Sequence, residues 1–125
     1  MKEKFFTVIQ VLAGLILLAF GANTFLHFMP MPEAAPAMGE FLGALFKSGY
    51  VFPIIGVIKI LAGLAFLSNK YAALMAVIIM PVMLNAFLAH LYLDPEGIAG
   101  SAFTVFAIII VMIRYKDRYK EIFKS

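Results

Sequence analysis

Six polar residues stand inside or beside long apolar runs of this 125-residue chain, and they are its main candidates for chemistry. They are Asn23, His27, Lys59, Asn85, His90 and Asp94. Lysine donates hydrogen bonds from a charged amine, whereas asparagine and neutral histidine both donate and accept. Polar groups placed among apolar residues of a membrane segment are costly, and they mark ligand or ion pathways by default. The set therefore predicts a polar binding site for a small ligand.

Lys59 is the most informative of the six, because it stands about eight residues from either end of an apolar run. A lysine at the centre of a bilayer costs roughly 2.5–3.5 kcal/mol on insertion scales. Gly56 and Gly63 share its helix face and permit the close approach of a second helix. We expect Lys59 to point into a bundle, with its amine leaning toward the start of its helix. The structural alternative is a snorkelled lysine that bonds backbone carbonyls and only fixes helix register.

The other five residues lie farther along the same direction than the lysine. Asn23 and His27 are four residues apart, as are His90 and Asp94, so each pair shares one helix face. Counted at 1.5 Å per residue, the lysine lies about 15 Å from one set of helix ends, Asn85 about 21 Å, and Asn23 and His90 about 27–28 Å. We expect a polar pocket with the lysine as its floor and Asp94 as its rim. The alternative is that these residues only bond neighbouring helices.

Four apolar runs must position these residues, and each is long enough, or nearly so, to cross a hydrocarbon core of roughly 30 Å as a helix. They cover about 5–28, 51–67, 71–93 and 98–113. Hydrophobic residues make up 64% of the chain and charged residues 14%, against roughly 25% charged in an ordinary soluble domain. The composition predicts an all-α, integral membrane four-helix bundle that forms a single transmembrane domain, 1–125. It excludes a soluble globular enzyme.

Basic residues are concentrated in the connections on one side of the predicted bundle. Eight of the ten Lys and Arg residues lie there: Lys2, Lys4, Lys70, Arg114, Lys116, Arg118, Lys120 and Lys124. Because cytoplasmic loops carry an excess of Lys and Arg, we expect both termini in the cytoplasm and a basic cytoplasmic tail over 114–125. A tail of this kind contacts anionic lipid headgroups. We do not expect it to bind nucleic acid.

The longest connection joins the first and second apolar runs. Pro30, Pro32 and Pro36 disfavour a helix in its first part. Apolar side chains then recur at helical spacing, with Glu40 and Lys47 on another face. We expect a short amphipathic helix here, lying on the outer surface of the membrane.

Several kinds of chemistry are excluded by residues that the chain lacks. It contains no cysteine and only two histidines, so thiolate metal sites and iron–sulfur clusters are excluded. No glycine-rich phosphate loop occurs. His27, Met29 and Met31 contain ligands that suit Cu(I), but methionine is common in this chain, so we assign no metal site. We expect no covalently bound cofactor, and a stand-alone enzyme is the least favoured function.

Residues 21–33, 48–53, 56–63, 81–85 and 90–95 form a pattern that spans nearly the whole chain and resembles the DoxX-like family of small bacterial membrane proteins. The last of these stretches has the spacing His-x-x-x-Asp-Pro. The resemblance implies a four-helix protein of the bacterial cytoplasmic (inner) membrane. It also implies association with quinol oxidase and thiosulfate–quinone chemistry, or with other membrane oxidoreductase complexes.

The chain departs from that family at two positions. Relatives often carry a lysine where this chain has Thr24, and a glutamate where it has Lys59. The predicted pocket is therefore cationic here, whereas the family pattern implies a nearly neutral one. A cationic pocket suits an anionic or strongly polarised ligand, such as a quinone oxygen.

Three functions fit these observations. The first is an accessory subunit of a membrane oxidoreductase system that binds a quinone-like or other lipophilic molecule, with Lys59, Asn85 and His90 bonding its polar end. The second is a small-molecule transporter or permease, for which four helices are few unless copies assemble into a homo-oligomer. The third is a purely structural assembly protein whose glycine seams dock onto larger partners.

Overall fold

The computed structural model describes residues 2–27 and 35–122, and every regular element in this part of the chain is helical. The elements are α1 (Lys2–Leu26), α2 (Pro36–Lys47), α3 (Val51–Ser68), α4 (Ala72–Leu93), η1 (Pro95–Gly97), α5 (Ile98–Arg114) and η2 (Lys116–Tyr119), where η denotes a 3-10 helix. Helices α1, α3 and α4, and α5 together with η1, are long and apolar enough to cross a membrane. The predicted all-helical fold with four candidate spans is confirmed.

The first helix is shifted toward the N-terminus relative to its predicted range. It begins at Lys2 because backbone hydrogen bonding continues beyond the apolar residues on which the prediction was based. It ends at Leu26 because His27 adopts a left-handed conformation with a φ of 51°. The His27 amide still donates to the Asn23 carbonyl at 2.9 Å, so this histidine terminates the helix.

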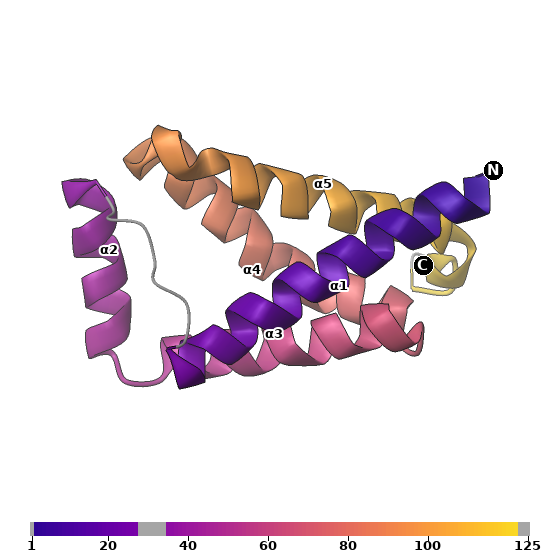
Figure 1. The fold of residues 1–125 in the computed structure, drawn as a ribbon, viewed down its shortest axis with the longest axis horizontal. Helices are drawn as coiled ribbons and strands as arrows, with labels where there is room; N and C mark the ends of the chain where they lie inside the picture. Colours follow the sequence, from indigo (N-terminus) through magenta and orange to yellow (C-terminus); the bar gives the residue numbers. More distant parts are fainter. Residues whose placement is uncertain (1, 28–34, 123–125) are drawn as a thin grey trace.

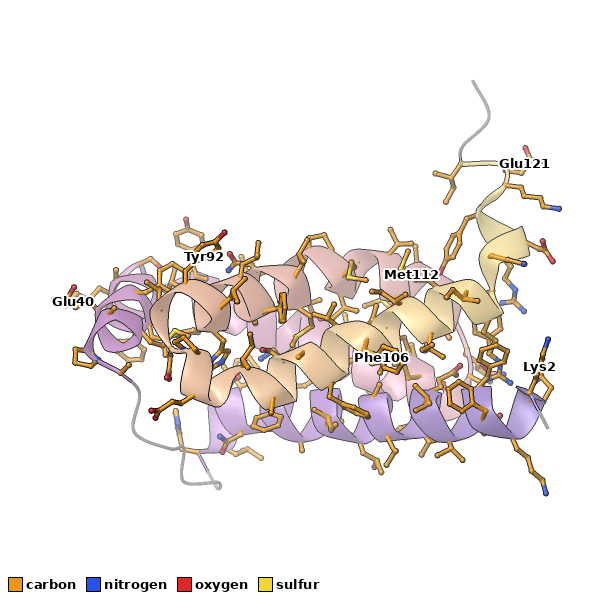
Figure 2. All side chains as sticks on the ribbon, turned by 90° about the horizontal axis from the view of Figure 1, so that it is seen from above. Lys2, Glu40, Tyr92, Phe106, Met112 and Glu121 are labelled. Carbon is orange, nitrogen blue, oxygen red and sulfur yellow. The ribbon has the colours of Figure 1, made fainter. Side chains whose placement is uncertain are left out.

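The four long helices form a closed bundle in which α1 packs along α3 and α4 packs along α5 (Figure 1). Contacts between α1 and α5 and between α3 and α4 join the two pairs. The start of α1, the α3–α4 turn and η2 gather at one end, which we call the basic end. The opposite end, beside α2, is the α2 end. Figure 2 shows Lys2 and Glu121 at the basic end, and Glu40 and Tyr92 at the α2 end.

Apolar side chains occupy both the core and the outer surface of the bundle. Phe66 and Ile79 are among the largest fully buried side chains. Others, such as Leu61 and Phe106, are about half exposed on the outside. A polar exterior would be expected in water, whereas an apolar exterior with internally satisfied helices suits a bilayer.

Glycines allow α1 and α3 to pack closely, as the sequence predicted. A Cβ atom added at Gly63 would lie 2.7 Å from the Leu18 backbone nitrogen and 2.8 Å from the Gly14 carbonyl oxygen. One added at Gly21 would lie 2.9 Å from α3. At Gly100 in α5, by contrast, an added Cβ would meet nothing within 4 Å. The close seam therefore belongs to the α1–α3 pair.

The short helix predicted between the first two spans is present as α2. Pro36 occupies its first turn, where a missing amide hydrogen costs nothing. Met38 is buried, and the helix contacts both α3 and α4. Phe46 is 70% exposed, although its ring lies 6.3 Å from that of Phe52 in α3. One face of α2 therefore packs toward the bundle while the other stays uncovered.

Candidate functional site

Lys59 lies on α3 at the glycine seam with α1. Its Cβ would be 2.9 Å from a Cβ added at Gly21, and its side chain is half-buried. Among residues 2–27 and 35–122, no hydrogen bond or ion pair engages its amine. The seam thus holds the stem of the side chain, while the three donors of the ammonium group are left for another partner.

The α1 surface one helical turn away from this lysine offers it no carboxylate. A Cβ added at Gly56 would lie 2.7 Å from the Phe25 ring and 3.1 Å from the Thr24 methyl group. The Thr24 hydroxyl donates to the Phe20 carbonyl at 3.1 Å, within its own helix. The α1 surface packed at Gly56 therefore presents an aromatic ring and a locally bonded hydroxyl, one turn before the lysine.

Asn23 and His27 are not arranged as their four-residue spacing predicted. Asn23 is buried within α1. His27 is exposed, and its left-handed backbone takes it off the helical path that would place it above Asn23. The helix-face argument therefore applies to the asparagine and does not extend to the histidine.

Asn85 lies on the outward-facing side of α4. Its side chain is exposed, as are those of Pro81 and Leu84 nearby. The part of the chain that the structure describes provides no hydrogen bond to the Asn85 amide. In a single chain, this residue therefore faces the surroundings of the bundle.

His90 and Asp94 lie together, as their spacing predicted. Nδ1 of His90 is 3.4 Å from the backbone oxygen of Asp94, and the Asp94 amide donates to the His90 carbonyl at 3.0 Å. A Cβ added at Gly97 would lie 3.0 Å from the His90 ring. The imidazole therefore packs against the turn between α4 and η1. A pocket lined by all six predicted residues stays a prediction.

A second polar group, which the sequence analysis missed, closes the basic end of the bundle. Gln10 of α1 is buried, and its Nε2 donates to the Phe66 carbonyl and to Oδ1 of Asn69, both at 3.0 Å. Nη1 of Arg114 donates to Oε1 of Gln10 at 2.9 Å. One glutamine thus links α1, the end of α3 and the end of α5.

Arg114 and Asn69 extend this set into what we call the Gln10 network. Nη2 of Arg114 donates to Oε2 of Glu3 at 2.8 Å and to the Thr7 hydroxyl at 3.3 Å. The Tyr115 hydroxyl donates to Oδ1 of Asn69. Gln10 could have been found by the criterion that selected the lysine, namely a polar residue within an apolar run. The partners of Gln10 could not have been found in this way, because they are distant from it in the sequence.

The last described turns of the chain are fastened beside this network. The Tyr119 hydroxyl donates to the Ala73 carbonyl at 2.6 Å, and Tyr119 is buried. Burial raises the pKa of the Tyr119 phenol above its ordinary value, and the Arg118 guanidinium opposes part of that shift. The phenol therefore stays protonated and acts as a donor at neutral pH.

No metal ligand set is formed by the described residues, since no three His, Cys, Asp or Glu side chains among them are grouped to hold an ion. Met29 and Met31, considered above for Cu(I), lie outside the described residues. Comparisons of the chain with protein-family models, with curated proteins and with solved structures found no match. Any functional argument therefore rests on the geometry of the chain itself.

Proposed function

We propose that this chain is a DoxX-like protein of a bacterial cytoplasmic membrane that binds a quinone-like or other lipophilic small molecule at Lys59. It serves as an accessory subunit of a membrane oxidoreductase system, because the described residues offer a polar binding group and form no redox-metal ligand set beside it. The basic end faces the cytoplasm, and α2 lies on the outer surface of the membrane.

The distribution of charge supports this orientation. Lys70 and Arg118 belong to the α3–α4 turn and η2 at the basic end. Figure 2 shows Lys2 at the same end and Glu40 at the α2 end. Lys and Arg concentrate on the cytoplasmic side of membrane proteins. The exposed apolar face of α2 then suits an interfacial position.

The single observation that carries the ligand proposal is the unpaired amine of Lys59 within an apolar span. A half-buried cation without a protein partner in the described residues is unfavourable in lipid. A carbonyl or anionic oxygen of a lipid-soluble molecule would accept its hydrogen bonds and offset that cost. The Phe25 ring, which packs at Gly56 one turn away on α3, would supply apolar contact for the body of such a molecule.

The test compares Lys59→Met with Lys47→Met, which removes a lysine at the end of α2 and serves as the matched control. The full chain is placed in lipid nanodiscs and titrated with ubiquinone-1. We expect the first variant to bind at least about tenfold more weakly, because a hydrogen bond to a charged group is lost. The control is expected to bind as the wild type does.

The free energy of unfolding of the same two variants distinguishes a ligand-binding role for Lys59 from a role that only fixes helix register. If Lys59 binds a ligand, Lys59→Met leaves the unliganded bundle equally stable or more stable, because it removes an insertion cost of up to roughly 3 kcal/mol. If the lysine only fixes helix register, the variant is less stable and ubiquinone-1 affinity is unaffected. That second pattern would refute the proposal.

A structural assembly function is the second candidate, and the exposure of Asn85 favours it. An amide that faces hydrocarbon without a partner costs several kcal/mol, and a polar side chain on a facing helix would satisfy it. The partner is a second copy of the chain or another membrane subunit.

Single-molecule counting in native membrane fragments tests this second function. Asn85→Leu is expected to shift oligomers toward single chains, whereas the control Leu61→Ala, on an exposed face of α3, is not. Unchanged copy numbers together with unchanged co-purifying subunits would remove the assembly function.

A further inference from the structure

An open pocket of about 650 Å³ lies at the basic end, far from Lys59. It is formed where the α3–α4 turn meets η2, which is drawn in yellow at the basic end in Figure 1. Its lining residues are Asn69, Lys70, Tyr71, Ala73, Leu74 and Arg118. Two of them, Lys70 and Arg118, are cations that lie 48 positions apart in the chain (118 minus 70).

Two tyrosines hold this arrangement in place. Tyr119 donates to the Ala73 carbonyl at 2.6 Å, and Tyr115 donates to Oδ1 of Asn69, so η2 is fastened to the first turn of α4 and to the α3–α4 turn. The Arg118 guanidinium lies 4.7 Å from the centre of the Tyr115 ring, a favourable cation–π distance. The arginine is therefore held next to the pocket by the fold.

The positive charge in the pocket is not neutralised by the described residues. No acidic side chain lines it. Asp117 pairs with Lys120 at 3.4 Å, and Glu3 pairs with Arg114 at 2.8 Å. The pocket is therefore complementary to an anion.

The surroundings of the pocket indicate an anion that belongs to a lipid. Leu74 lies in the first turn of α4, a candidate membrane span, and its side chain is 55% exposed. Tyr71 precedes that helix and is 76% exposed, which suits the headgroup level, where tyrosine is enriched. An acyl chain can thus lie along Leu74 while its phosphate lies between the two cations.

We infer that this pocket binds the headgroup of an anionic phospholipid, with Lys70 and Arg118 contacting the phosphate. It is a defined site, distinct from the general attraction of a basic tail for an anionic surface. It is also independent of the ligand proposed for Lys59.

The test uses the full chain in phosphatidylcholine micelles, with retained phosphatidylglycerol counted by native mass spectrometry. The double variant Lys70→Gln/Arg118→Gln removes both pocket cations, and Lys116→Gln/Lys120→Gln removes the same charge outside the lining. We expect phosphatidylglycerol retention to fall about tenfold or more in the first, since the charge-assisted hydrogen bonds that both pocket cations donate to the phosphate are lost. The control is expected to stay within twofold of the wild type.

Each remaining outcome contradicts the inference. Equal losses in both double variants would mean that diffuse surface charge binds the lipid. Displacement of the lipid by millimolar inorganic phosphate would make this a site for a soluble anion. If circular dichroism shows that the pocket variant is unfolded, the test uses Lys70→Arg/Arg118→Lys, which keeps both charges. This variant is expected to fold and to retain the lipid. Loss of retention in the folded variant would overturn the proposed site.

Discussion

The two ends of the bundle use polar side chains in different ways. At the basic end, the side-chain hydrogen bonds of Gln10, Arg114, Tyr115 and Tyr119 join residues separated by 46 to 111 positions in the sequence. Toward the α2 end, the bonds made by the side chains of Thr24, Ser48, His90, Ser101 and Thr104 stay within four positions.

The two ends of the bundle therefore differ in the interactions that hold their helices together. Long-range hydrogen bonds fix the register of α1, α3 and α5 at the basic end. Nearer the α2 end, α1 and α3 are held mainly by close glycine packing. Elements with few specific tertiary bonds are the ones that open at low free-energy cost. A ligand approaching Lys59 would therefore enter from the α2 half.

The largest expected effect comes from opening the α1–α3 seam. Gly63→Ala should destabilise the bundle by about 3 kcal/mol, because the new Cβ would lie 2.7 Å from a backbone atom that cannot rotate away. Gly100→Ala is the matched control, since its Cβ meets nothing within 4 Å. Unfolding in mixed micelles, followed by circular dichroism, measures both. Equal stability of the two variants would show that close packing does not hold the α1–α3 seam.

Breaking the Gln10 network should have the next largest effect. Arg114→Met leaves Oε1 of Gln10 and the Glu3 carboxylate without their shared partner, at a cost of about 2 kcal/mol. Lys116→Met is the control, because it removes a nearby exposed cation. Arg114→Met should thus lower the free energy of unfolding, whereas Lys59→Met should leave it unchanged or raise it. If Arg114→Met and Lys59→Met changed the free energy of unfolding in the same direction and by a similar amount, the two ends of the bundle would not differ in this way.

The smallest expected effect concerns the fastening of η2. Tyr119→Phe removes the bond to Ala73 and should cost about 1 kcal/mol at neutral pH. Because burial raises the folded-state pKa of this phenol, the unfolded chain loses its proton first. The contribution is complete below the ordinary tyrosine pKa of about 10 and is lost as the pH rises through the folded value.

The measurement is the melting temperature between pH 8 and 11 for the wild type, Tyr119→Phe and the control Tyr92→Phe, whose side chain is 78% exposed. The wild type and the control should lose stability more steeply than Tyr119→Phe at the alkaline end. Parallel curves for all three proteins would mean that the Tyr119 phenol is not buried in the folded state.

Several features were predictable because they depend on local composition or on helical spacing. The four apolar runs predicted helices, since backbone groups in lipid must be satisfied within the segment. Gly56 and Gly63 predicted close approach of a helix to α3, and His90 with Asp94 predicted a contact one turn apart. Each of these inferences needs only residues within one run.

Other features could not be predicted because they depend on how one helix is rotated against another. Asn85 seemed as suitable for an interior position as Lys59, but the rotation of α4 places it on the exposed side. The spacing of His27 predicted the same helix face as Asn23, but the left-handed backbone of His27 takes it off that face. No periodicity within a uniformly apolar helix specifies which side faces inward.

The sequence by itself determined an all-helical chain with four candidate spans, because an excess of apolar residues in long runs leaves few other ways to satisfy the backbone. Only the tertiary structure decided which polar residues meet. It joined Gln10 with Asn69 and Arg114, and it placed Lys70 and Arg118 in the lining of one pocket. These partners come from different helices and turns, so their contact depends on helix order, rotation and the path of the last turns, which local composition does not encode.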